Sequence, residues 1–186
     1  IDDIKRFIAD LELQEENRFI PEKLFDYSDK KIAIIGAGPA GLSCAFYLAI
    51  KGYTITVFEK EEKLGGMLTL GIPSYRLEKN VVEAEIDVLK QMGVTFKTGV
   101  EVGKDITIPQ LREEGYNGFF LAIGAQGGRK LNIEGADHKD VIAGVDFLRD
   151  VNLGKSVVTP GQVVVIGGGN VAIDVARTAA RTGASS

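Results

Sequence analysis

Lys31–Leu48 reads KIAIIGAGPAGLSCAFYL and joins a short run of apolar, mostly β-branched residues, a glycine-rich turn and an apolar helix. Gly36 permits a tight turn, Gly38 leaves no side chain where a pyrophosphate would approach, and Gly41 lets the helix pack closely on the strand. The free N–H groups at the start of such a helix favour a phosphate. The stretch therefore predicts a strand, a turn and a helix that bind a dinucleotide.

A second strand is predicted over Tyr53–Phe58, and it is followed directly by Glu59. Glu59 stands about 18 positions after Gly41, near the spacing of about 20 at which an acid binds the ribose hydroxyls of a dinucleotide. A carboxylate here would repel a 2′-phosphate, so we expect the adenosine of FAD or NAD rather than that of NADP. The alternative interpretation is an ordinary solvated acid within a charged stretch.

The end of the sequence repeats this order, with a strand predicted over Gln162–Ile166, a glycine turn and a helix. Its turn follows G-x-G-x-x-A, in which Ala172 takes the position that needs only close helix packing. This predicts a second dinucleotide turn. Asn170 and Asp174 share a helix face, where they would orient a ligand amide or contact another domain; alternatively, Asp174 faces solvent. The residue that would read the second ribose lies beyond Ser186, so these motifs do not separate NADH from NADPH.

Between these units, Leu64–Arg76 has paired glycines followed by apolar residues without a helical or strand period. In one interpretation Gly66 lets the backbone approach a flat ring, Met67 and Leu68 lie along that ring, and Arg76 faces a carbonyl or phosphate. In the other, the segment is a surface turn with a few buried anchors. The glycine turn upstream favours the first.

The remaining periodicity predicts alternating helices and strands. Gly118–Gly124 is fully apolar, as expected of a parallel strand buried on both faces. The small residues after it, Gly124–Gly128, form either a ligand crevice or a flexible loop. Further elements are expected as helices over residues 78–92, 108–114 and 144–153, and as a strand over residues 94–98.

The composition and charge of the chain argue against nucleic-acid, membrane and metal-binding functions. The 186 residues carry a net charge of −4 and are 45% hydrophobic, enough for one core and part of a second. Without a basic cluster or an apolar run of about 20 residues, we expect a soluble cytoplasmic protein with no nucleic-acid or membrane partner. Cys44, the only cysteine, is expected to be an unreactive structural thiol. His138, the only histidine, has no partner at metal-ligand spacing, so we expect a solvated loop residue and no metal site.

Taken together, these motifs resemble the flavoprotein family of the glutamate synthase small subunit. This family includes the matching domains of dihydropyrimidine dehydrogenase and of bifurcating ferredoxin oxidoreductases. The resemblance covers residues 30–186, and its most specific part is the I-P-x-x-R-L segment Ile72–Leu77. It implies a Rossmann-like α/β flavoprotein fold with two nested dinucleotide-binding domains, FAD on the first and NADPH or NADH on the second. Hydride would pass from the nicotinamide to the flavin, and electrons would leave through iron-sulfur clusters.

The resemblance also assigns residues to the cofactors. No protein side chain is expected to be catalytic, because the flavin performs the redox chemistry. The positions expected to bind FAD are Gly36, Gly38 and Gly41 at the pyrophosphate, Glu59 at the ribose, and Gly66, Met67, Leu68 and Arg76 at the isoalloxazine side. Further cofactor-binding positions are expected at Pro39, Ala40, Lys60 and Gly124. Those expected at the pyrophosphate of the nicotinamide cofactor are Gly167, Gly169, Asn170 and Ala172.

Three parts are expected from this resemblance. Residues 1–29 form a helical arm with Ile4, Phe7, Ile8 and Leu11 on one stripe, either a packing arm or the end of a preceding cluster domain. Residues 30–155 form an FAD-binding domain without its returning C-terminal segment, and residues 156–186 begin an NAD(P)-binding domain. We therefore expect a fragment of a larger oxidoreductase with impaired turnover, whose iron-sulfur clusters lie in missing parts or in a partner.

Two alternatives remain open on the sequence alone. In a single-cofactor NAD-dependent dehydrogenase Glu59 would serve equally well, but the second glycine turn would have no role and no convincing acid-base group is present. In a non-catalytic dinucleotide-fold fragment, the glycine turns would be retained but empty.

Overall fold

The computed structural model describes residues 1–15, 18–128, 131–157, 159 and 161–186. The chain divides into two compact units. Unit 1 comprises Ile1–Gly66 and Lys79–Gly124, and unit 2 comprises Met67–Glu78 and Ala125–Ser186. These bounds differ from those of the expected cofactor domains, residues 30–155 and 156–186, and the assignment of cofactors to domains stays a prediction.

Unit 1 is built on a four-stranded parallel sheet in the order β3-β2-β1-β4. Its strands are β1 (Tyr27–Ile35), β2 (Tyr53–Glu59), β3 (Thr95–Thr98) and β4 (Tyr116–Leu121). β1 pairs on both sides, with Ile34 opposite Val57 of β2 and Phe120 of β4. The order reverses between β1 and β4, and ligands of open α/β sheets bind beyond the carboxyl ends of the strands at such a point. The predicted α/β class is confirmed.

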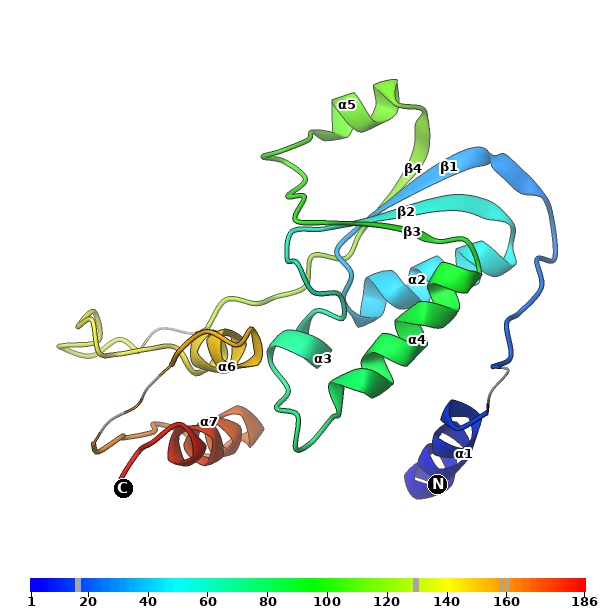
Figure 1. Ribbon diagram of the computed structural model, residues 1–186. Helices are drawn as coiled ribbons and strands as arrows, with labels where there is room; N and C mark the ends of the chain where they lie inside the picture. Colours follow the sequence, from blue (N-terminus) through cyan, green and yellow to red (C-terminus); the bar gives the residue numbers. More distant parts are fainter. Residues whose placement is uncertain (16–17, 129–130, 158, 160) are drawn as a thin grey trace. The chain divides into compact units, whose positions relative to one another are not determined.

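Helices cover both faces of this sheet (Figure 1). α2 (Pro39–Ile50) and α4 (Lys79–Gln91) cover one face, where the core includes Ile34, Val57 and Leu89. α5 (Ile108–Glu113) lies on the other, where Leu111 packs with Ala33 and Phe58. Consecutive side chains such as Ala33 and Ile34 therefore pack on opposite faces of the sheet, as the alternation of strand side chains requires.

The last strand of the sheet is less buried than expected. β4 ends at Leu121, and Phe120 and Leu121 expose 40% and 65% of their surface. The prediction of a strand over Gly118–Gly124 buried on both faces is therefore wrong in extent and in burial. The reason is the strand order, because β4 is an edge strand of the described sheet.

The N-terminal arm forms α1 (Asp2–Leu13), as its periodicity predicted, and its apolar stripe is exposed. Arg18 connects the arm to α4. Its guanidinium donates to the Glu12 carboxylate (Nε–Oε1 3.0 Å), to the Ala84 carbonyl oxygen (2.7 Å) and to the Glu85 carboxylate (2.9 Å). One arginine thus holds α1 and α4 through three acceptors.

Unit 2 contains α3 (Met67–Leu70), α6 (Gly144–Asn152) and α7 (Asn170–Arg181), with a small core of Phe147, Leu148 and Ala179. The strand predicted over Gln162–Ile166 is wrong, because 162–168 has no regular structure and Val164 and Ile166 are 86% and 68% exposed. A parallel strand needs a neighbouring strand. In the described part of unit 2, the one bridge of this region joins Gly161, just before the segment, to Ala184 after α7, and the Val163 N–H donates to the Ser186 carbonyl oxygen at 3.0 Å.

Two further expectations concern membranes and metals. Across the residues that the structure describes, no helix has both the length and the apolar character needed to span a bilayer, and a cytoplasmic location stays a prediction. His138 is exposed, as expected, and its Nδ1 lies 3.5 Å from the Asp140 carboxylate. The residues that the structure describes contain no cluster of ligating side chains that would hold a metal ion.

Candidate functional site

The first glycine turn connects β1 to α2 at the point where the strand order reverses. Gly36 has φ +104°, and a Cβ atom there would lie 2.4 Å from the Ala122 carbonyl oxygen just after β4. At Gly41 a Cβ atom would lie 1.9 Å from the Gly36 carbonyl oxygen. Both positions therefore require glycine, one for the turn and one for helix packing, as the motif predicted.

Gly38 differs from these two glycines because the space beside it is open. A Cβ atom there would meet only the Gly66 Cα atom, at 3.9 Å. Gly38 is also the N-cap of α2, and no side chain caps that helix. The first N–H groups of α2 thus have no side-chain partner, which is the arrangement that favours an anion.

The paired glycines after β2, Gly65 and Gly66, contact this turn. The Gly65 N–H donates to the Ala37 carbonyl oxygen at 2.9 Å. Gly66 has φ +55°, and a Cβ atom there would lie 2.7 Å from the Gly38 Cα atom. Gly66 is therefore glycine because another backbone passes beside it, and it lies next to Gly38 as part of the same candidate site.

Glu59 ends β2 and points its carboxylate at the glycine turn. Its side chain accepts the Ala37 N–H at Oε2 (2.7 Å) and the Glu61 N–H at Oε1 (3.0 Å). The residue is 6% exposed, so the interpretation of Glu59 as an ordinary solvated acid is wrong. A buried carboxylate held by two backbone donors lies where the motif predicts a ribose-binding acid.

The other residues predicted around the first turn are more exposed. Pro39 and Ala40 form the exposed start of α2, and the Lys60 side chain is exposed directly after Glu59. Gly124 has φ +68° and no atom within 4 Å of a Cβ position. It lies three residues beyond β4.

Unit 2 contains the second glycine turn. Gly167 has φ +133°, and Gly169 is the N-cap of α7 without a side-chain cap. A Cβ atom at Gly167 would approach the Ala172 Cβ atom to 3.3 Å, so a larger residue at either position would crowd the turn. The predicted turn and helix are confirmed, although the strand before them is absent.

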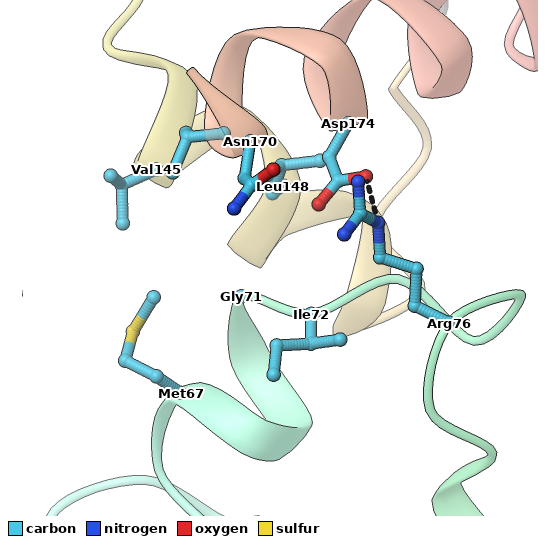
Figure 2. A pocket seen from close by; sticks show the side chains of 9 residues that line it. Met67, Gly71, Ile72, Arg76, Val145, Leu148, Asn170 and Asp174 are labelled. Atoms are coloured by element: carbon cyan, nitrogen blue, oxygen red, sulfur yellow. Dashed lines mark ion pairs between the residues drawn. The ribbon is translucent and has the colours of Figure 1, made fainter. Parts of the chain in front are cut away.

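A cavity of about 260 Å³ opens beside this turn, within unit 2 (Figure 2). Apart from Arg76, Asn170 and Asp174, its lining is apolar. Figure 2 shows the arginine beside Asp174, with Met67 and Ile72 from one segment facing α6 and α7. The lining residues are Met67, Gly71, Ile72, Arg76, Val145, Leu148, Asn170, Val171 and Asp174.

Charge in the cavity is concentrated on one ion pair. The Arg76 Nε atom lies 2.6 Å from Asp174 Oδ1, and the Tyr75 hydroxyl donates to the same oxygen at 3.2 Å. Asp174 is 7% exposed, so the interpretation in which it faces solvent is wrong. The cavity thus combines an apolar wall with a fixed cation and an amide.

The predicted residues therefore group by unit. In unit 1, Gly36, Gly38, Gly41, Glu59 and Gly66 come together. In unit 2, Met67, Arg76 and Asn170 share the cavity, while Leu68 does not line it. The sequence left the role of Asp174 open between two interpretations, and it did not point to Tyr75. Two features of the sequence could have indicated these residues. Asp174, Arg177 and Arg181 are spaced along one helix face, and Tyr75 directly precedes the arginine of the I-P-x-x-R-L segment.

Comparison with known proteins agrees with this geometry. A family model described as pyridine nucleotide-disulphide oxidoreductase matches residues 30–185. The chain belongs to the pyridine nucleotide-disulphide oxidoreductase family. Its match includes both glycine turns, Glu59 and the cavity segment Met67–Arg76.

Within this family, the chain is 42% identical over 204 residues to the NADP(+)-dependent formate dehydrogenase subunit beta of Moorella thermoacetica, covering 97% of this chain and 29% of that protein. It is 45% identical over 170 residues to the glutamate synthase (NADPH) small chain of Halomonas elongata, covering 86% of this chain and 36% of that protein. The latter relative confirms the predicted resemblance to the glutamate synthase small subunit.

Among solved structures, the chain resembles Mycobacterium tuberculosis FprA in complex with NADPH. The TM-score is 0.66 at 28% identity, covering 80% of this chain and 36% of FprA. This likeness confirms the Rossmann-like fold. The chain spans about a third of the length of each of these three proteins.

Proposed function

We propose that this family member is part of an FAD-dependent oxidoreductase in which NADPH or NADH reduces the flavin. The observation that carries the proposal is that two glycine turns each lead into a helix without a side-chain cap, at Gly38 and at Gly169. A single-cofactor dehydrogenase would leave one of these turns without a ligand.

FAD fits the first turn. The open space beside Gly38, where a Cβ atom would meet nothing nearer than the Gly66 Cα atom at 3.9 Å, leaves room for a pyrophosphate at the start of α2. Glu59 would exchange its bond to the Ala37 N–H for ribose hydroxyls, since its carboxylate already lies at the turn. Its negative charge favours FAD over a cofactor with a 2′-phosphate. Gly36 and Gly41 shape the turn and do not themselves require a ligand.

The nicotinamide cofactor fits the second turn. Gly167 and Gly169 shape its backbone, and α7 presents its uncapped N-terminus there. The resemblance assigned Arg76 to the flavin side, but Arg76 lines the same cavity as Asn170, and we propose that it faces the nicotinamide cofactor instead. With these two residues at its polar end, the cavity is suited to a flat ring that carries a polar group. The names of the Moorella and Halomonas relatives include NADP(+) and NADPH, which supports NADPH as the first cofactor to test.

When bound, the flavin supplies the redox chemistry, accepting a hydride from the reduced nicotinamide and passing electrons on one or two at a time. The protein residues bind the cofactors and orient them. We further propose that the electrons leave to iron-sulfur clusters or to another subunit. This agrees with relatives that are named as a beta subunit and a small chain.

The proposal is tested by mixing the FAD-loaded protein with NADPH or NADH in the absence of oxygen and following the visible flavin absorbance. We expect one of the two cofactors to bleach the flavin bands stoichiometrically, and a stronger chemical reductant added last to cause no further bleaching. Flavin that stays oxidised with both cofactors, but is bleached by the chemical reductant, would contradict the proposal.

A further inference from the structure

Two consecutive residues of the segment Met67–Glu78 are held by α7. Arg76 pairs with Asp174 through its Nε atom at 2.6 Å, and the Tyr75 hydroxyl donates to the same carboxylate oxygen at 3.2 Å. Because Asp174 is 7% exposed, its carboxylate has little water around it and depends on these partners. The carboxylate therefore fixes the direction of both side chains.

The Tyr75 ring is held by two further residues of the same helix. The guanidinium carbons of Arg177 and Arg181 lie 4.1 and 4.4 Å from the ring centre, within the range of cation–π attraction. Asp174, Arg177 and Arg181 follow one another at three- and four-residue steps and therefore share one face of α7. We call Tyr75, Arg76 and these three residues the α7 clamp.

None of the five clamp residues belongs to the small hydrophobic core of unit 2, which is formed by Phe147, Leu148 and Ala179. The Arg76 side chain is 38% exposed, so its charge would be hydrated if Asp174 were neutral. An ion pair with one exposed partner adds little stability. The main consequence of the Arg76–Asp174 ion pair is geometric. It engages the Nε atom of Arg76 and so holds the guanidinium at the cavity.

The terminal nitrogens of Arg76 are left available by this arrangement. Within the part of the chain that the structure describes, neither of them has a hydrogen-bond partner, while Arg76 itself lines the cavity beside Asn170. A guanidinium that binds through Nε keeps its outer N–H groups free to donate to a ligand.

We propose that Asp174 is a positioning residue for the nicotinamide cofactor, which orients the Arg76 guanidinium toward the ligand in the cavity. The inference rests on the proposed function, because the ligand class is that of the second glycine turn. Asp174 acts through Arg76 and makes no contact with the reacting atoms. It follows that the two residues contribute to cofactor binding as one unit.

The clamp itself is tested without any cofactor, by trypsin cleavage after Arg76. We expect Asp174→Asn to speed this cleavage by about tenfold, because a neutral amide oxygen holds the guanidinium more weakly than a carboxylate does, while it still accepts the Tyr75 hydroxyl. Asp146→Asn is the matched control, since Asp146 is exposed in the first turn of α6 and the charge change is identical. Cleavage after Arg76 at an equal rate in both variants would overturn the clamp.

The role in binding is tested by calorimetric titration of NADPH and of NADH, and by the steady-state kinetics of the FAD-loaded protein with ferricyanide as the electron acceptor. We expect Asp174→Asn and Arg76→Gln each to raise Kd and KM by about tenfold with kcat changed less than about twofold. The double variant should bind no more weakly than Arg76→Gln alone, since one residue acts through the other. Asp146→Asn should change neither constant.

The outcomes separate this inference from the function on which it rests. If the unmodified protein neither binds nor oxidises either cofactor, the proposed function fails and the inference fails with it. If the unmodified protein is active but the two substitutions leave Kd unchanged, or weaken binding additively, only the positioning role of Asp174 is wrong. A loss of kcat and of retained flavin at constant Kd would show a merely structural role and would also overturn it.

Discussion

Gly41 shows how a single residue determines the first turn. Its missing side chain lets α2 approach β1 so closely that a Cβ atom would lie 1.9 Å from the Gly36 carbonyl oxygen. The contact is with backbone, which cannot rotate away as a side chain can. Gly168, in the second turn, has no atom within 4 Å of a Cβ position. A glycine-to-alanine substitution there adds the same methyl group as at Gly41 but causes no clash.

We expect Gly41→Ala to lower the free energy of unfolding by about 3 kcal/mol, the upper end of what overpacking costs. Gly168→Ala should change it by less than about 0.5 kcal/mol. Urea denaturation of both variants and of the unmodified protein measures the difference. Equal stability of the two alanine variants would contradict the close packing of α2 at Gly41.

Cys44 illustrates a residue whose environment suppresses its chemistry. It is half-buried in α2 and packs at the edge of the core between that helix and the sheet. Burial raises the pKa of the Cys44 thiol above its ordinary value, because the thiolate is desolvated. The sequence predicted an unreactive thiol, and this direction agrees with it.

A raised pKa leaves less thiolate at any given pH, so alkylation of Cys44 should be slow. At about pH 8 we expect iodoacetamide to modify the folded protein several times more slowly than the protein in urea. Mass spectrometry of quenched samples follows both reactions. Modification at the same rate in the folded and unfolded protein would show that Cys44 is freely solvated.

At the scale of elements, the arm that contains α1 depends on Arg18. This side chain reaches Glu12, the Ala84 carbonyl oxygen and Glu85, whereas Arg6, among the described residues, pairs with Asp10 on its own helix. We expect Arg18→Ala to increase amide exchange across α1 by about tenfold while exchange in the sheet stays unchanged. Arg6→Ala is the matched control, and an equal effect of the two variants would contradict the role of Arg18.

The same contact gives the arm a pH dependence. Hydrogen bonding from Arg18 holds the pKa of the Glu12 carboxyl below its ordinary value, against the opposing effect of burial. A lowered pKa in the folded state means that the attachment is complete above the ordinary glutamate range, about pH 4, and is lost as pH falls through the lowered value. Amide exchange in α1 should therefore rise on acidification before exchange in the sheet does. Simultaneous loss of protection in both would contradict this order.

Elements set by local chemistry were predictable from the sequence. The β1–α2 turn and Glu59 at the end of β2 follow from glycine positions and alternation within a few residues. Gln162–Ile166 looks equally like a strand, yet a strand forms only with a neighbour to pair with, and the sequence pattern does not contain that information. The exposure of β4 depends on strand order for the same reason.

The candidate site was predictable to a similar degree. Gly36, Gly38 and Gly41 were found because each has a distinct steric task. Asp174 was left between two interpretations, since its partners Tyr75 and Arg76 lie about 100 positions earlier in the sequence. Contacts between residues so distant are decided by how segments pack, and no local period reports them.

At the scale of the whole molecule, the proposed function depends on which ligand each glycine turn binds. Unit 1 combines an uncapped helix start, an open approach at Gly38 and a buried acid at Glu59. Unit 2 combines a second uncapped helix with a cavity that contains an oriented arginine. These features differ, and we expect the two turns to discriminate between cofactors, with FAD on the first and NADPH or NADH on the second.

The most direct test is a titration of FAD into the unmodified protein and into Glu59→Gln, followed by flavin fluorescence, with NAD as a competitor. We expect saturable binding of FAD that NAD does not displace. Binding should be weaker by about tenfold or more in Glu59→Gln, because hydrogen bonds to a charged acceptor contribute about 1.5–3 kcal/mol. Absence of binding at saturating FAD, or its displacement by equimolar NAD, would contradict an FAD site at the first glycine turn.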